Sequence, residues 1–412
     1  MANPLRAFTA RGLGLICLGL ALAIGGFAIG ERDLVALGVL AFTLPLLSML
    51  TVIGAPRRAV HSRALQPPRV TAGSEARVLI RVANSSAVLP IGGLLAADTL
   101  PFPLGQEPRF SIGYLRPRAA RDITYRVRAH VRGLYPIGPL KLSCTDPLGC
   151  VRIRREVGTH MSLLVTPSVV PLPQAPLPGG SANGGDTPAR SMSGGGEDDP
   201  VPRVYRRGDD LRRVHWRSTA RHGELMVRRE EHQWSDRSAV LVDMRASAHA
   251  GVGPDSSLET AVGTAGSIAL HLLGRGQDLR LLSGGREIAR SRAESVLDAL
   301  AVLGPSATAD LSGETGVLAD ASITGNGLLI TVLGALGSAD LGALVQARGA
   351  REHRCVAVLC QTAAWPSPDT ARQAADALSQ AGWLVLEIGS IRELAGVWHR
   401  LPAHSGARGG RR

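Results

Sequence analysis

The segment Ser238-Ala239-Val240-Leu241-Val242-Asp243 decides the fold of the second half of the chain. A short apolar run that ends at an aspartate is typical of a strand buried on both faces. From this point onward, apolar runs of strand length alternate with amphipathic segments of helical period. The predicted strands cover 238–243, 278–282, 327–333, 355–360 and 383–388, and the predicted helices cover 257–273, 293–303, 339–347, 369–380 and 391–399. This alternation predicts a doubly wound α/β domain with a mainly parallel sheet.

The region upstream of this domain has a different pattern. From Ser62 to Leu172, polar and apolar residues alternate in runs such as 76–82 and 122–128, as in half-buried strands. Turn signals separate these runs at 84–86, 116–118, 135–138 and 146–149. The pattern predicts a β-sandwich-like domain. A Gly-, Ser- and Pro-rich linker follows at residues 173–202.

Two uncharged apolar segments lie near the N-terminus, at about residues 12–30 and 34–55. Each is close to the roughly 20 residues that cross a bilayer, so we expect a transmembrane hairpin. A secretory signal peptide is the alternative for the first segment. Basic residues flank both outer ends of the hairpin, which by the positive-inside rule places both ends in the cytoplasm. We therefore expect a cell-membrane protein with two spans and cytoplasmic soluble domains.

The domain boundaries follow from these patterns. The transmembrane part covers 1–61, the β-sandwich-like domain 62–172, the linker 173–202, the α/β domain with the segment before it 203–403, and a basic tail 404–412. The fold class is thus a membrane-anchored chain of mixed all-β and α/β type.

The composition excludes several functions. The net charge is +12 and Lys141 is the only lysine, so a Walker A loop with its Gly-Lys pair is absent. Few aromatics accompany the arginines, so we expect no nucleic-acid binding. Arg57, Arg58 and Arg63 follow the second apolar segment, and we expect them to attract anionic lipid.

A motif between linker and α/β domain is the most specific part of the sequence. It contains Tyr205, Gly208, Asp209, Arg212, Trp216, Ala220 and Arg221, followed by Leu225 and Val227. Here the chain resembles the family called domain of unknown function 58. A second stretch of likeness runs from Arg132-Gly133-Leu134-Tyr135 to Asp146-Pro147-Leu148-Gly149. The resemblance implies a von Willebrand A-like α/β domain. It also implies a MoxR-type AAA+ ATPase as partner, because family members are commonly encoded beside such ATPases.

Three interpretations of this motif are open. We favour a structural clasp between the two soluble domains, in which Asp209 pairs with Arg212 or Arg221 and Trp216 is a buried apolar anchor. The second interpretation is a surface that binds a partner. Catalysis by Asp209 and His215 is the weakest, because a lone carboxylate and a lone histidine are too common to indicate an acid/base pair.

The loop after the first α/β strand bears on metal binding. The resemblance implies Asp-x-Ser-x-Ser here, part of a Mg²⁺ site, whereas this chain has Asp243-Met244-Arg245-Ala246-Ser247. Arg245 would repel a divalent cation and could instead pair with Asp243. The loop after strand 327–333 has no acid before Asp340, so a third-loop ligand is expected to be missing. We predict a degenerate site with no metal.

Together these features predict a membrane-anchored adaptor or assembly factor that is not an enzyme and needs no cofactor. No Gly-x-Ser-x-Gly elbow is present. The alternative is a Mg²⁺-dependent ligand-binding module on the same fold. The expected partners are the ATPase, other membrane proteins and the lipid bilayer.

Overall fold

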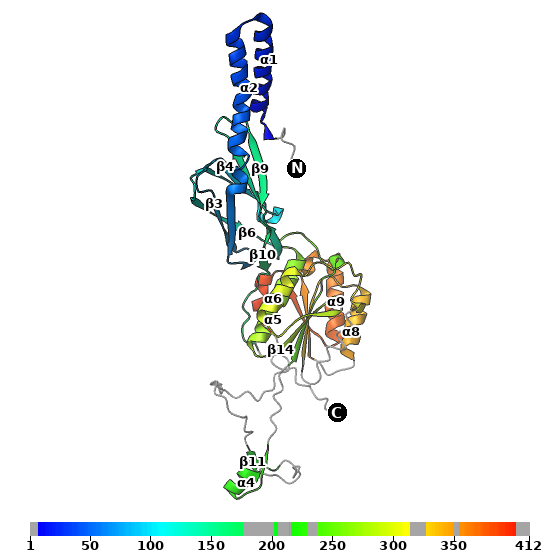
Figure 1. Cartoon of the computed structure of the whole chain (residues 1–412). Helices are drawn as coiled ribbons and strands as arrows, with labels where there is room; N and C mark the ends of the chain where they lie inside the picture. Colours follow the sequence, from blue (N-terminus) through cyan, green and yellow to red (C-terminus); the bar gives the residue numbers. More distant parts are fainter. Residues whose placement is uncertain are drawn as a thin grey trace.

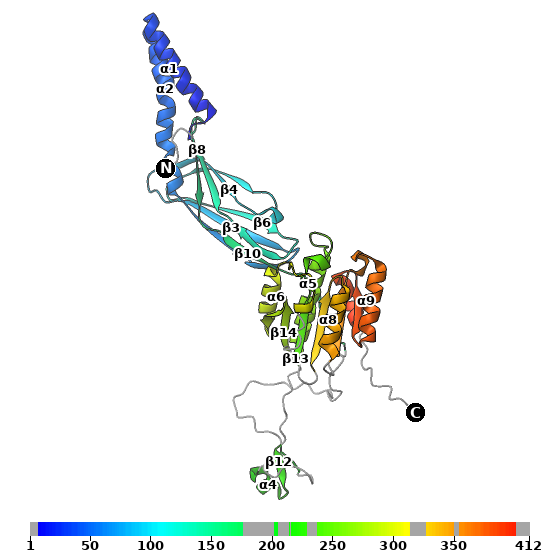
Figure 2. The ribbon, with the colours of Figure 1, turned by 90° about the vertical axis from the view of Figure 1, so that its right-hand side faces the viewer.

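The computed structural model describes residues 7–175, 202–204, 214, 216–228, 237–313, 327–349 and 354–400. Three parts follow one another along the molecule: a helix hairpin, a sheet-rich domain (hereafter the β domain) and an α/β domain (Figure 1). The 90° view in Figure 2 has the same order, with the β domain between the other two parts.

The hairpin consists of α1 (Ala10–Ile29) and α2 (Arg32–Val52). Glycines recur every seven residues on the buried face of α1, at Gly12, Gly19 and Gly26. A Cβ on Gly19 would lie 2.5 Å from the backbone nitrogen of Phe42, so the absence of a side chain lets the helices touch. Both helices are long and apolar enough to cross a membrane, by length and composition. The two predicted apolar segments are therefore confirmed as helices.

Hydrogen bonds fix the hairpin to the β domain. Thr9, the N-cap of α1, donates through Oγ1 to the carbonyl of Gly149 at 2.6 Å and through its backbone N–H to Cys150 at 2.9 Å. The buried Asp146 shapes this turn, because its carboxylate accepts from the N–H groups of Leu148 and Val151. The predicted turn at 146–149 therefore contacts the start of the first helix. On the other side, α2 continues into the short helix α3 (Ala55–Arg58).

The β domain contains ten strands in three small sheets around one apolar core. The strands are β1 (Ala59–Gln66), β2 (Arg69–Thr71), β3 (Glu75–Asn84), β4 (Ile91–Asp98), β5 (Arg109–Leu115), β6 (Ala120–Arg128), β7 (Gly133–Ile137), β8 (Leu140–Thr145), β9 (Arg152–Val157) and β10 (Met161–Thr166). The sheet orders are β1-β3-β6, β2-β10-β7 and β5-β4-β8-β9. One predicted turn is wrong: residues 135–137 belong to strand β7, which pairs with β10, and the chain turns only at Gly138-Pro139.

The α/β domain has a six-stranded sheet of order β15-β14-β13-β16-β17-β18, with all neighbours parallel except the antiparallel edge strand β15. The strands are β13 (Arg237–Val242), β14 (Asp278–Ser283), β15 (Arg286–Arg290), β16 (Leu328–Leu333), β17 (Arg354–Cys360) and β18 (Leu384–Ile388). The helices are α5 (Ser257–Gly274), α6 (Ala293–Val302), α8 (Ser338–Gly349), α9 (Pro368–Gln380) and α10 (Leu394–Trp398).

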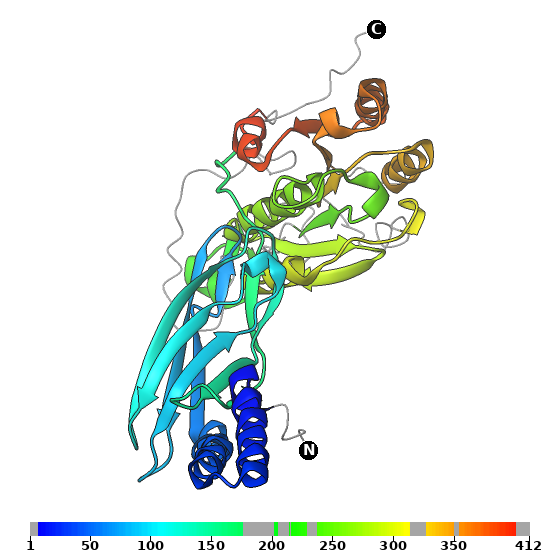
Figure 3. The ribbon, with the colours of Figure 1, turned by 90° about the horizontal axis from the view of Figure 1, so that it is seen from above.

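Helices cover both faces of this sheet. Residues of α5, α6 and α10 share one core with it, and residues of α8 and α9 share the other. Figure 3 shows the two helical layers from above. Cys355 and Cys360 lie in opposite cores, as their odd spacing predicts. The predicted strands are all present, β15 was not predicted, and the last predicted helix is shorter than expected.

The motif segment forms a small unit of its own within the described residues. Strand β11 (Pro202–Val204) pairs with β12 (Met226–Arg228), and helix α4 (Trp216–His222) lies between them in sequence. Figures 1 and 2 show this unit at the end of the molecule opposite the hairpin. Tyr205, Gly208, Asp209, Arg212 and His215 lie outside the described residues.

Candidate functional site

Arg245 lies at the carboxyl end of β13, inside the α/β domain, and its guanidinium is fully hydrogen-bonded. Its Nε and Nη2 donate to Asp243 at 3.0 and 2.8 Å, as a two-pronged fork. Nη1 donates to Asp340 at 2.8 Å. The remaining N–H groups reach the carbonyls of Ala335 at 3.2 Å and Ala309 at 3.5 Å. All five donors of the guanidinium are thus used.

The two carboxylates of this cluster are also held by backbone N–H groups. Asp340, in the first turn of α8, accepts from Leu311 at 3.0 Å and from Gly337 at 2.8 Å. Asp243 accepts from Gly334 at 3.3 Å. The cluster therefore joins the ends of β13 and β16, the loop before Leu311 and the start of α8.

The expectation about the third loop is wrong. Asp340 is seven residues beyond the end of β16, but the chain folds back so that its carboxylate reaches Arg245. The predicted pairing of Arg245 with Asp243 is confirmed. Ser247 is exposed on the 3-10 turn η4 (Ala246–Ala248) and is not among the partners of Arg245.

These residues do not fit a Mg²⁺ ion. A hard cation needs the carboxylate oxygens that Arg245 already occupies. Burial alone would lower the pKa of Arg245, but the hydrogen bonds and charges of Asp243 and Asp340 outweigh it and raise that pKa, so the cation stays charged. Within the described part of the chain, no three His, Cys, Asp or Glu side chains gather as a metal site would require.

His249 braces the loop that follows Arg245. Its Nε2 lies 2.9 Å from the carbonyl of Asp243 and its Nδ1 lies 3.1 Å from Ser257 Oγ. Burial lowers the pKa of His249 below its ordinary value, so the ring is neutral near pH 7. A neutral ring donates from Nε2 to the carbonyl and accepts at Nδ1, which matches both contacts.

Arg132, in the second stretch of family likeness, joins the two soluble domains. Its Nε and Nη2 donate to the carbonyls of Leu300 and Leu303 at the end of α6, at 2.8 and 2.9 Å. Its Nη1 pairs with Glu259 in the first turn of α5. The guanidinium thereby satisfies carbonyls that a helix end leaves without partners. Tyr135 holds the Arg132 loop by donating to the carbonyl of Val131 at 2.8 Å.

Trp216 does not form the expected clasp. Its side chain is 71% exposed on α4, so the prediction of a buried anchor between domains is wrong for this residue. Ala220 and Arg221 are also exposed. The ion pairs expected between Asp209 and either Arg212 or Arg221 lie outside the described residues. Arg132, and not Trp216 as predicted, joins the two soluble domains.

Arg63 also differs from its prediction. Strand β1 begins at Ala59, and its alternation turns Arg63 inward, where the side chain is 4% exposed and pairs with the buried Asp98. Tyr125 donates to the same carboxylate at 2.6 Å. A side chain enclosed in this way does not reach lipid, so of the three predicted lipid-facing arginines only Arg57 and Arg58 remain at the helix end.

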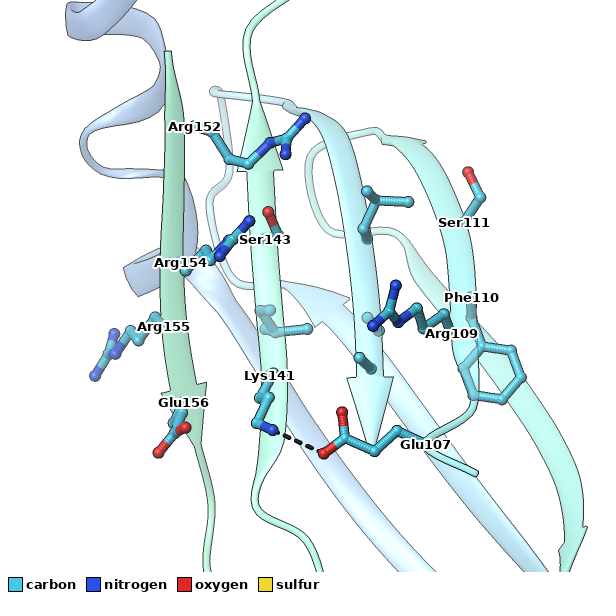
Figure 4. Close-up of a pocket in the computed structure, with 14 residues that line it drawn as sticks. Glu107, Arg109, Phe110, Ser111, Lys141, Ser143, Arg152, Arg154, Arg155 and Glu156 are labelled. Atoms are coloured by element: carbon cyan, nitrogen blue, oxygen red, sulfur yellow. Dashed lines mark hydrogen bonds and ion pairs between the residues drawn. The ribbon is translucent and has the colours of Figure 1, made fainter. Parts of the chain in front are cut away.

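A groove crosses the outer face of the β5-β4-β8-β9 sheet (Figure 4). Its volume is about 910 Å³. Arg109 flanks it on β5, and Arg152 and Arg154 flank it on β9. Lys141 pairs with Glu107 at 2.8 Å at one end. The side chains of Arg109 and Arg154 make no hydrogen bond or ion pair with the residues that the structure describes, so the groove offers free cationic groups to an anionic ligand.

Fold and site define a class: a hairpin of apolar helices that carries a β domain and an α/β domain with an arginine-filled sheet edge. Residues 202–363 match the family model described as "Protein of unknown function DUF58". This match supports the resemblance to the domain of unknown function 58 family. No curated protein matches the chain.

Several solved structures are similar to parts of the chain. The CARDB domain of a Pyrococcus furiosus protein is 13% identical, with 26% of this chain and 88% of that one covered and a TM-score of 0.19. The C-terminal domain of wzt is 14% identical, with coverages of 28% and 83% and a TM-score of 0.20. The alkylpurine DNA glycosylase AlkC of Pseudomonas fluorescens is 13% identical, with coverages of 33% and 39% and a TM-score of 0.20. At such TM-scores these likenesses carry no argument about fold or function.

Proposed function

We propose that this chain is a membrane-anchored, non-catalytic adaptor whose motif segment binds a protein partner, a MoxR-type AAA+ ATPase. The helix hairpin anchors the chain in the cell membrane, and the soluble domains face the cytoplasm. The ATPase enters the proposal through the family resemblance, and the residues below support the binding role.

The α/β domain is proposed to be von Willebrand A-like. Its sheet order, with β13 central and β15 antiparallel at the edge, agrees with that assignment. So does Asp243 at the end of the first strand. Because Arg245 fills the ligand position, we propose that this domain works without a metal. The alternative Mg²⁺-dependent module requires those carboxylates to be free.

The exposure of Trp216 is the observation that carries the proposal. A large aromatic ring loses much of its unfavourable hydration when a partner covers it, and tryptophan is enriched at binding hot spots. The unit around it has two three-residue strands and a seven-residue helix. Two-stranded units of this size are marginally stable alone. Contact with a partner would stabilise the unit and bury the ring at the same time.

Co-purification tests the proposal. The tagged full-length chain is extracted from its native membranes in mild detergent, and bound proteins are identified, for wild type and Trp216→Ala. Phe102→Ala is the matched control, because Phe102 is also an exposed aromatic residue, 95% exposed, in the β domain. We expect the ATPase with wild type and Phe102→Ala and its loss with Trp216→Ala, at unchanged melting temperature.

Two results would refute the proposal. One is full recovery of the ATPase with Trp216→Ala. The other is the absence of any AAA+ ATPase from the wild-type eluate. A third arm adds EDTA during purification. Loss of the partner in EDTA would favour the Mg²⁺-dependent module, whereas a metal-free adaptor keeps its partner.

A further inference from the structure

Three turns of the β domain gather at the end where the helix hairpin enters it. The turn between β8 and β9 holds Thr9, as described above. The turn between β3 and β4 contacts the end of α3, since Ser85 donates through its N–H and its hydroxyl to the carbonyl of Arg58, both at 2.9 Å. The turn between β5 and β6 joins them, because Arg118 N–H donates to Ser86 at 3.0 Å. We call residues 57–58, 85–90, 115–118 and 147–152 the proximal rim.

The proximal rim exposes large apolar side chains. Val88 is 78% exposed, Leu89 53% and Leu148 51%. All three lie in turns, where water-facing positions are normally polar. Single exposed apolar residues need no explanation, but three in neighbouring turns at one end of a domain form a surface suited to an apolar environment.

The charges of the proximal rim all have one sign. Arg57, Arg116 and Arg118 are exposed there, and Arg152 extends from the start of β9. The sequence of the rim contains no Asp or Glu. The nearest carboxylate in these turns, Asp146, is buried and accepts backbone hydrogen bonds. Arginines around exposed aliphatic side chains match the boundary between lipid headgroups and acyl chains.

The opposite end of the β domain lacks this combination. Asp98, at the far end of β4, is enclosed by Arg63 and Tyr125. Beyond it, Phe102 is exposed, but Glu107 and Lys141 lie on the same side as an ion pair. The distal end therefore presents an acidic as well as a basic group, whereas the charged residues of the proximal rim are all basic.

We propose that the proximal rim lies on the bilayer that holds the helix hairpin. Val88, Leu89 and Leu148 enter the headgroup region, and the rim arginines bind phosphates of anionic lipid. This inference rests on the proposed membrane anchoring. Because the proximal rim contacts the start of α1 and the end of α3, it fixes the tilt of the β domain on the membrane. Arg132 joins the α/β domain to the β domain and so fixes the orientation of the α/β domain as well.

The test uses spin labels on the full-length chain. In a Cys17→Ala background the four other cysteines are buried, so labels are placed at Val88→Cys and, as control, at Phe102→Cys. The chain is reconstituted in nanodiscs of phosphatidylglycerol and phosphatidylcholine. Collision with lipid-soluble oxygen and with a water-soluble neutral nickel chelate is then measured for each label.

We expect the label at position 88 to be several-fold less accessible to the nickel chelate, and more accessible to oxygen, than the label at position 102. Equal nickel accessibility at both positions overturns the inference. Resistance of the chain to alkaline extraction from native membranes is measured in parallel. Extraction of the chain would refute the anchoring itself, which separates the failure of the proposed function from that of the rim.

A second comparison tests the arginines. Arg116→Glu with Arg118→Glu should make the label at position 88 accessible to water in anionic nanodiscs. Arg126→Glu is the matched control. It also changes an arginine to an acid, but Arg126 lies in the distal half of β6, where its side chain is 65% exposed. Equal melting temperatures show that the variants are folded. If the label at position 88 is no more accessible to the nickel chelate in the double variant than in the original chain, the role of the arginines is refuted.

Discussion

Replacing Arg245 by serine removes the cation from a buried cluster and leaves two carboxylates behind. Asp243 and Asp340 are 1% and 4% exposed, so neither can recover its hydration in place. Removing one partner of a buried ion pair costs about 3–5 kcal/mol. For a domain of this size, each kcal/mol lowers the melting temperature by about 2–4 °C, which gives a loss of roughly 6–20 °C.

The same substitution creates a set of oxygen ligands. Serine restores Asp-x-Ser-x-Ser, and Asp340 supplies a second carboxylate. We therefore expect Mg²⁺ to stabilise the Arg245→Ser variant. A ligand present at 100 times its dissociation constant adds about 2.7 kcal/mol. Wild type should not respond, because its guanidinium holds the carboxylates.

Thermal unfolding of the full-length chain in detergent, with EDTA or with Mg²⁺, measures both effects. Arg280→Ser is the matched control: Arg280 pairs with Glu287 at 2.6 Å, but both side chains are 30% exposed. Such surface pairs contribute about 0–1 kcal/mol. Adding Asp340→Asn to Arg245→Ser should abolish the Mg²⁺ response. An Arg245→Ser variant that melts like wild type, or a wild type stabilised by Mg²⁺ by several degrees, would refute this account.

Three further predictions concern the domain junction, the hairpin and pH. Arg132→Ala should leave Glu259 unpaired and cost about 3–5 kcal/mol, seen as an earlier first unfolding transition, whereas Arg126→Ala at an exposed pair should cost less than about 1 kcal/mol. Gly19→Ala should lower the melting temperature by forcing α1 from α2, and Gly14→Ala, with nothing within 4 Å of its Cβ, should not; equal effects would contradict the helix contact. The pKa of His249 is lowered in the folded state, so the unfolded chain binds more protons as pH falls below about 6.5. Stability should therefore fall as the pH drops through about 6.5, and His249→Gln should flatten that dependence; a pH profile identical to wild type would show that this ring does not contribute.

The α/β fold could be predicted because its signals are local. A strand such as β13, buried on both faces, must be apolar throughout, and an amphipathic helix such as α5 must show its period in its own sequence. β15 was missed because Arg286–Arg290 is short, polar and half-exposed at the sheet edge. Only its antiparallel pairing with β14 defines it as a strand.

The site was only partly predictable because its contacts are not local. Asp243 and Arg245 are two residues apart, and their pairing followed from the sequence. Asp340 joins them from 95 residues away, and the available signal was an acid in the first turn of a helix after a buried strand. Arg132 lies in the second stretch of family likeness, but no residue near it in the sequence indicates that its partners lie on α5 and α6.

The errors at Trp216 and Arg63 come from assigning burial by residue type. A tryptophan is usually part of a core, but the unit around α4 is too small to enclose one. An arginine near a membrane segment usually faces lipid, but the strand register of β1 turns Arg63 inward, where Asp98 neutralises it. In both cases exposure depends on what the rest of the fold places around the side chain, which leaves Trp216 exposed and pairs Arg63 with Asp98.

Thr9 joins the hairpin to one end of the β domain, and Arg132 joins the α/β domain to the other end. The β domain is therefore a spacer of fixed length. Its longest strand, β3, has ten residues, so at about 3.3 Å per residue it spans up to about 33 Å. That length is close to the diameter of a small domain. If the hairpin lies in a bilayer, the α/β domain is held far enough away for a soluble protein to fit beneath it. A partner in that space would meet the α/β domain at a height set by the β domain, and shortening the strands of the β domain would exclude it.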